Sequence, residues 1–158
     1  MDSHRITALI AAAALLPPTA GAATAGLAAA DACSVLTAAQ VSAVLGVHVA
    51  PGQHVVPDAH SSCGWAPPGD PSLGAKKLVL TLMSARGFET GKTPVKSATK
   101  LVAMAVGDEA YYITTPPFGT ALSVKKGDSY FQVRISGFPE AQAAHLEKAV
   151  ALKLLKGA

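Results

Sequence analysis

The sequence contains little charge and few aromatic side chains. Of its 158 residues, 15% are charged and 5% are aromatic. Lys and Arg together number 13 and Asp and Glu 10, which gives a net charge of +3. The lysines occur singly or in pairs along the chain, which is unlike the concentrated basic patch of a nucleic-acid-binding protein. We therefore expect no nucleic-acid partner.

The motifs of common enzyme classes are also missing. The sequence has no phosphate-binding glycine loop, no G-x-S-x-G nucleophile elbow, and no S-x-x-K motif with partners. Asp108 and Glu109 pair two carboxylates, but neighbours in a turn tend to point apart, whereas a glycosidase needs carboxyls that face each other across a substrate. We expect a structural turn here, and a small hydrolase remains an alternative.

No apolar run is long enough to span a membrane. The longest, Ile6–Leu16, has about 11 residues, whereas a transmembrane helix needs roughly 20. A positive start, this short apolar run and a stretch of small residues are typical of a secretory signal peptide. Ala28-Ala29-Ala30 fits an A-x-A cleavage site and would make Asp31 the first mature residue; cleavage after Ala23 is a weaker option. The mature chain is expected to be periplasmic or secreted, with no transmembrane anchor.

Removal of the signal peptide, residues 1–30, leaves 158 − 30 = 128 residues. This is the size of a single domain, 31–158, with one core. Only two cysteines are present, Cys33 and Cys63, and an even number in an exported chain favours a disulfide between them. Closure of this loop of about 30 residues stabilises the fold by roughly 3–4 kcal/mol in the chain-entropy model.

Local patterns predict helices at both ends of the mature chain and strands between them. Thr37 and Gln40 form a T-x-x-Q capping box, and Gly46 supplies the stop of a short helix. Alternating apolar and polar residues predict strands at 77–84 and 129–136, and Pro139-Glu140 opens a C-terminal helix. We predict an α+β fold: an antiparallel sheet of about five to seven strands with the N- and C-terminal helices packed on one face.

The segment 48-HVAPGQHVVPDAHSSCGW-65 contains three histidines at intervals of six residues. A zinc or copper site needs imidazoles that converge on the ion, often with a carboxylate such as Asp58. Only a folded-back loop could bring His48, His54 and His60 together, and a disulfide that closes this segment would permit it. Three solvated loop histidines are the simpler interpretation.

Aromatic residues beside the expected strands provide a second candidate site. In the pairs Tyr111-Tyr112 and Tyr130-Phe131, adjacent residues of a strand point to opposite faces of the sheet. One member of each pair is therefore expected on an open face. The candidate binding surface comprises Trp65, Tyr112, Tyr130 and Arg134.

Four stretches together resemble a group of small exported bacterial proteins of uncharacterised function. They are 33-CSVLTAAQVSAVLGVHV-49, 54-HVVPDAHSSCGW-65, 106-VGDEAYY-112 and 123-SVKKGDSYFQVRISG-137. The resemblance implies a Cys33–Cys63 bridge and a compact α+β domain. More distantly, the pattern is similar to PsbP-like domains of cell-envelope lipoproteins, although this chain has no lipobox. It carries no catalytic residues to transfer.

These observations favour a secreted or periplasmic binding module without catalytic activity or a cofactor. Its expected partner is an envelope protein or a small ligand. A metal-binding protein that uses the histidine loop to hold zinc or copper is the alternative, and a small hydrolase is a further one.

Overall fold

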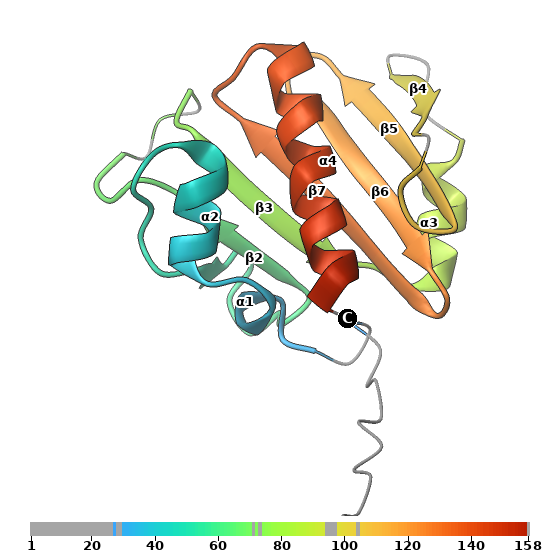
Figure 1. Cartoon of the computed structure of the whole chain (residues 1–158), viewed down its shortest axis with the longest axis horizontal. Coiled ribbons are helices and arrows are strands. Elements are labelled where there is room, and N and C mark those ends of the chain that lie inside the picture. The colour runs from blue at the N-terminus through green and yellow to red at the C-terminus, as the bar shows by residue number, and fades with distance from the viewer. Residues whose placement is uncertain are drawn as a thin grey trace, which may run out of the picture.

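The computed structural model describes residues 27, 30–70, 72, 74–93, 98–103 and 105–157. It is an α+β fold with a seven-stranded antiparallel sheet, in the order β1-β2-β3-β7-β6-β5-β4 (Figure 1). This confirms the predicted fold class, at the upper end of the expected strand number. The elements are α1 (Ala32–Val35), α2 (Ala38–Leu45), β1 (Gln53–His54), β2 (Ser62–Trp65), β3 (Lys77–Leu82), α3 (Ala85–Gly91), β4 (Thr99–Val102), β5 (Glu109–Thr115), β6 (Gly119–Lys126), β7 (Ser129–Ser136) and α4 (Glu140–Gly157).

Most of the predicted signal peptide lies outside the described residues. The signal peptide and its cleavage site therefore stay predictions. Within the described part of the chain, no helix combines the length and apolar character needed to cross a bilayer.

The predicted capping box forms at the start of α2. The Thr37 side chain accepts a hydrogen bond from the backbone N–H of Gln40, whose own side chain accepts one from the Thr37 N–H. Gly46 ends the helix in the left-handed conformation, with φ of 66°, which glycine adopts without steric cost. Val41 and Leu45 are buried, so the short helix presents one apolar face to the core.

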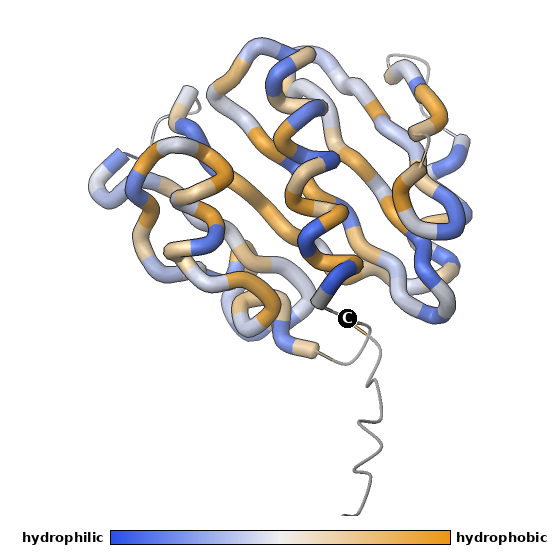
Figure 2. Tube along the Cα trace, in the orientation of Figure 1, coloured by the Kyte–Doolittle hydropathy of each residue, from blue (hydrophilic) through white to orange (hydrophobic). Residues whose placement is uncertain are grey.

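Strand alternation determines which side chains meet the helices. Along β7, Phe131, Val133 and Ile135 are buried, whereas the residues between them are partly exposed. Their partners on β3, Leu82, Leu80 and Leu78, are buried on the same face. Figure 2 shows hydrophobic residues along the strands behind α4, where this core lies.

Helices cover both faces of the sheet, unequally. The helices α1, α2 and α4 pack over the face that carries the main core, as predicted for the two ends of the chain (Figure 1). The hydroxyl of Tyr112 donates to the carbonyl of Ala144 on α4, whereas that of neighbouring Tyr111 donates to Phe88 on α3. Because adjacent strand residues point to opposite faces, α3 lies on the other side of the sheet.

A buried acid, Glu147, joins α4 to the sheet. Its Oε1 accepts a hydrogen bond from the backbone N–H of Ile135 on β7, at 3.0 Å, and one from the Thr120 hydroxyl on β6, at 3.2 Å. The side chain is fully buried, and its Oε2 has no hydrogen-bond partner among the described residues. Burial raises the pKa of Glu147 from 4.5 to about 7, because a carboxylate loses its hydration here.

This carboxyl makes stability depend on pH. A pKa raised in the folded state means that folding favours the protonated form, so its contribution is complete below pH 4.5 and declines as pH rises to about 7. The shift corresponds to about 3 kcal/mol across this window. We expect Glu147→Gln to flatten the decline in unfolding free energy between pH 4.5 and 7, measured by urea denaturation. Asp128→Asn, at an exposed turn, is the control, and an equal effect of both variants would contradict the assignment.

Candidate functional site

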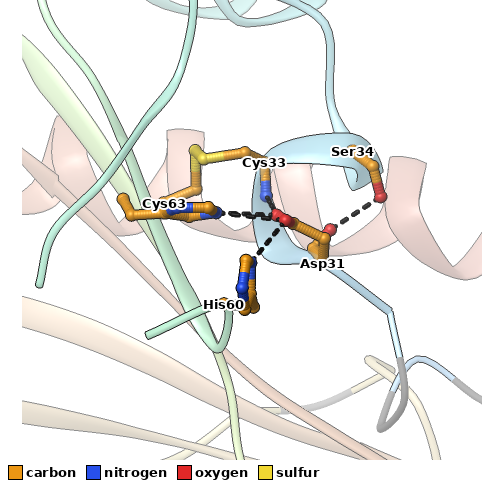
Figure 3. The surroundings of a disulfide bond; sticks show 6 residues. Asp31, Cys33, Ser34, His60 and Cys63 are labelled. Atoms are coloured by element: carbon orange, nitrogen blue, oxygen red, sulfur yellow. Dashed lines mark hydrogen bonds and ion pairs between the residues drawn. A yellow bond between two sulfur atoms is a disulfide. The ribbon is translucent and has the colours of Figure 1, made fainter. Parts of the chain in front are cut away.

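Asp31 lies at the start of the described domain and caps α1. Its Oδ1 accepts a hydrogen bond from the backbone N–H of Cys33 at 2.8 Å, which satisfies a free donor of the first helical turn. Its own carbonyl accepts from the Ser34 hydroxyl at 2.7 Å (Figure 3). These contacts hold the carboxylate in one orientation beside the disulfide.

Two histidines converge on this carboxylate. Nε2 of His54 lies 3.0 and 3.1 Å from its two oxygens, and Nδ1 of His60 lies 2.9 Å from Oδ2. An ionised carboxylate can only accept, so the hydrogen bonds place a proton on each of these ring nitrogens. The imidazole rings contact each other edge to face, with their centroids 4.7 Å apart.

Three links bring these distant residues together. The first is the predicted disulfide between Cys33 and Cys63, with the Cα atoms 5.0 Å apart. The second is a backbone hydrogen bond of 2.8 Å from the N–H of Ala32 to the carbonyl of His60. The third is the β1–β2 ladder, in which His54 pairs with Cys63. Asp31, His54 and His60 therefore each take part in one of these links or lie within two residues of one.

The site is open to solvent. The exposed fractions of the side chains are 27% for His54, 38% for Asp31 and 69% for His60. A hollow of about 540 Å³ adjoins it and is lined in part by Asp31, Cys33, Gly52 and His54. Ions and small molecules can therefore reach the three side chains without a change of fold.

Hydrogen bonding shifts the acidity of Asp31. The hydrogen bond from His54 is the largest cause, followed by those from Cys33 and His60, and together they lower its pKa from 3.8 to about 2. The carboxylate therefore keeps its charge throughout the neutral and mildly acidic range. A permanently ionised oxygen ligand beside two imidazoles is a donor set suited to a transition metal.

The geometry fits a metal ion of the zinc or copper type. One ligand atom from each of Asp31, His54 and His60 lies within 4.8 Å of the others. Tetrahedral zinc, with bonds of about 2.0–2.1 Å, holds its ligand atoms about 3.4 Å apart. For a metal ion to bind, the proton on each of these ring nitrogens would have to leave an imidazolium or move to the other nitrogen of a neutral ring, which would free the lone pair.

The structure brings together two of the three histidines predicted for the metal site. His54 and His60 come together, but exposed His48, just beyond the α2 stop, lies outside the cluster. The acidic member is Asp31 rather than Asp58, which occupies a turn with a positive φ of 64°. Asp31 is 23 and 29 residues from the two histidines. No local pattern marks it, and only the disulfide prediction could have pointed to this part of the chain.

The four residues of the candidate binding surface do not share one face. Trp65 is 1% exposed and belongs to the core, and Tyr112 points to α4 on the same side of the sheet. Tyr130 contacts Phe88 of α3, on the opposite side. Arg134 alternates with buried Val133 and Ile135, so it lies on the α3 side too. Strand alternation correctly predicted that adjacent residues point to opposite faces of the sheet. Which of the two faces α4 covers is determined by tertiary packing and could not be predicted from alternation.

Asp108 and Glu109 bind different structural partners. Asp108 accepts from the Lys126 ammonium and from the backbone N–H of Gly127, both at 2.7 Å, and so secures the β6–β7 turn. Glu109 accepts from Lys92 at 2.9 Å. The two carboxylates thus lack the facing arrangement that a glycosidase requires.

Comparison with protein-family models, with curated proteins and with solved structures finds no match to this chain. The resemblance to small exported bacterial proteins therefore stays a prediction, and function is inferred from the side chains themselves.

The Asp31 cluster can be tested by titration. We expect the pKa of the Asp31 carboxyl, followed by ¹³C NMR, to rise from about 2 toward 3.8 in His54→Ala, because the side chain that makes the largest contribution to the shift is removed. His48→Ala, outside the cluster, should leave it unchanged. A lowered pKa in the folded state contributes stability above pH 3.8 that is lost as pH falls toward 2. An unchanged Asp31 pKa in His54→Ala would refute the interaction.

Close packing around the disulfide gives a second test. A Cβ on Gly52 would lie 2.6 Å from Sγ of Cys63 and 2.7 Å from the Trp65 ring. Both groups are buried, so Gly52→Ala should destabilise the fold by about 1–3 kcal/mol in urea denaturation. Gly74→Ala is the matched control, because nothing lies within 4 Å of its added methyl group. Equal stability of the two variants would disprove the close contact.

Proposed function

We propose that this protein is an exported, non-catalytic binding module that binds Zn²⁺ or Cu²⁺ through Asp31, His54 and His60. The observation that carries the proposal is the convergence of their ligand atoms within 4.8 Å. Periplasmic or secreted location is part of the proposal. It is supported by the disulfide, which persists in oxidising compartments, and by the sequence pattern of the first 30 residues.

The ligand types favour these metals over the common hard cations. Imidazole nitrogens suit zinc and copper, whereas Ca²⁺ and Mg²⁺ select oxygen ligands. The Cys33 N–H that bonds to Oδ1 acts as an outer partner that orients the carboxylate, as is usual around metal sites. Three protein ligands leave a coordination position for water or for a further donor.

The expected cleavage after Ala30 would provide such a donor. A chain that begins at Asp31 carries a free α-amine on the residue whose carboxylate binds the metal. Amine and carboxylate of one aspartate can chelate the same ion. In this proposal, removal of the signal peptide completes the site, so the mature chain binds more tightly than a longer one.

Calorimetry tests the proposal directly. For the chain that begins at Asp31, we expect dissociation constants for Zn²⁺ and Cu²⁺ below about 100 µM at pH 7.5, with Cu²⁺ tighter, and no comparable Ca²⁺ binding. His54→Ala and His60→Ala should each weaken binding at least about tenfold. Because ligating imidazoles must lose their protons, affinity should fall between pH 7.5 and pH 5.5.

His48→Ala is the control, since it removes an exposed histidine outside the cluster. In a chain that begins at Ala30, Asp31 has no free α-amine but the three side chains are unchanged. Comparison with the chain that begins at Asp31 therefore measures the contribution of the α-amine to metal binding. The proposal fails if neither metal binds below about 100 µM, or if His48→Ala weakens binding as much as His60→Ala.

A further inference from the structure

The sheet opens between β6 and β7 at one end. The last residues paired between these strands are Leu122 and Val133. Both strands continue beyond this point, but β6 pairs only with β5, as far as Gly119, and β7 only with β3, as far as Ser136. The two halves of the sheet therefore separate here, beneath the N-terminal part of α4 (Figure 1).

Glu147 occupies the apex of this opening. Thr120 and Ile135, which would face each other if the ladder continued, both donate to its Oε1. The other oxygen is buried without a partner among the described residues. A buried polar atom of this kind is rare in folded proteins and calls for a partner such as a water or a ligand.

A pocket of about 520 Å³ adjoins the opening. This volume lies in the range of small-molecule binding sites. Thr120 and Ile135 line it as well as contacting Glu147, so the buried acid lies directly behind its wall. The remaining lining residues that matter here are two cations, Lys77 and Arg134, and two aromatic residues, Phe118 and Phe138.

The charges of the pocket favour an anion. Lys77 and Arg134 form no salt bridge within the described part of the chain, where all five ion pairs lie elsewhere. A third cation, Lys76, lies over the Phe138 ring at 4.9 Å from its centroid. The one acid that lines the pocket, Glu140, accepts a hydrogen bond from Thr114. Arginine binds carboxylate and sulfonate groups through two parallel hydrogen bonds, which makes Arg134 the anchor.

The aromatic residues favour an apolar body on the same ligand. Phe118 lines the pocket and is 64% exposed, so its ring is accessible to a bound ligand. We propose that the opening between β6 and β7 binds a small organic anion. Its acidic group would contact Arg134 and Lys77, and its apolar part would pack against Phe118 and Phe138. This site is independent of the metal site.

Fluorescent probes distinguish this proposal from simple apolar adsorption. Anilinonaphthalene sulfonate carries an anionic group, whereas N-phenyl-1-naphthylamine has the same rings without charge. We expect the anionic probe to bind the folded protein more tightly than the neutral one. Arg134→Gln should weaken the anionic probe about tenfold and leave the neutral one nearly unchanged. Phe118→Ala should weaken both.

Lys153→Gln, at an exposed position of α4, is the matched control, because it removes a positive charge away from the pocket. Circular dichroism of each variant verifies that the fold is intact, and decanoate should displace the anionic probe. The proposal is overturned if Arg134→Gln and Lys153→Gln bind the anionic probe equally, or if the neutral probe binds as tightly as the anionic one. His54→Ala should retain probe binding, so failure of the metal site and failure of this site are distinguishable.

Discussion

The disulfide between Cys33 and Cys63 is the constraint on which the arrangement of the N-terminal region depends. The helix that carries Cys33 has only four residues, too few to be stable through its own hydrogen bonds. Its position is fixed by the crosslink to β2 and by the hydrogen bond from Ala32 to His60. The disulfide therefore has two effects. It is expected to stabilise the fold by roughly 3–4 kcal/mol through closure of the loop, and it positions Asp31.

Asp31 combines two tasks that depend on one charge. The same carboxylate caps the first turn of α1 and accepts hydrogen bonds from two imidazoles. Both tasks favour the ionised form, which is why its pKa lies near 2. Protons on the two imidazoles and a metal ion would compete for the same lone pairs, since a ligating nitrogen must be unprotonated. Occupation of the proposed metal site would therefore require both nitrogens to be free of protons.

Local signals in the sequence determine much of the fold and little of the site. Thr37, Gln40 and Gly46 define α2 within one short segment, and the alternation of β7 identifies its buried face. The disulfide could be predicted from the even number of cysteines together with the expected export of the chain. The approach of Asp31 to His54 and His60 results from tertiary contacts between segments more than 20 residues apart. Strand alternation also does not reveal which face of the sheet α4 covers. That Trp65 and Tyr112 both lie on the covered face is known only from the structure.

The opening between β6 and β7 shows how one buried acid can replace part of a ladder. Where the strands separate, the N–H of Ile135 has no ladder partner on β6, and Glu147 provides the acceptor. An apolar residue at 147 would leave that donor unsatisfied, at a cost of about 1–3 kcal/mol. The carboxyl is itself costly to bury, and its second oxygen is left unpaired. A fully paired ladder would avoid both costs. Thr120 and Ile135, which donate to Glu147 where the ladder is interrupted, also line the pocket beside Arg134.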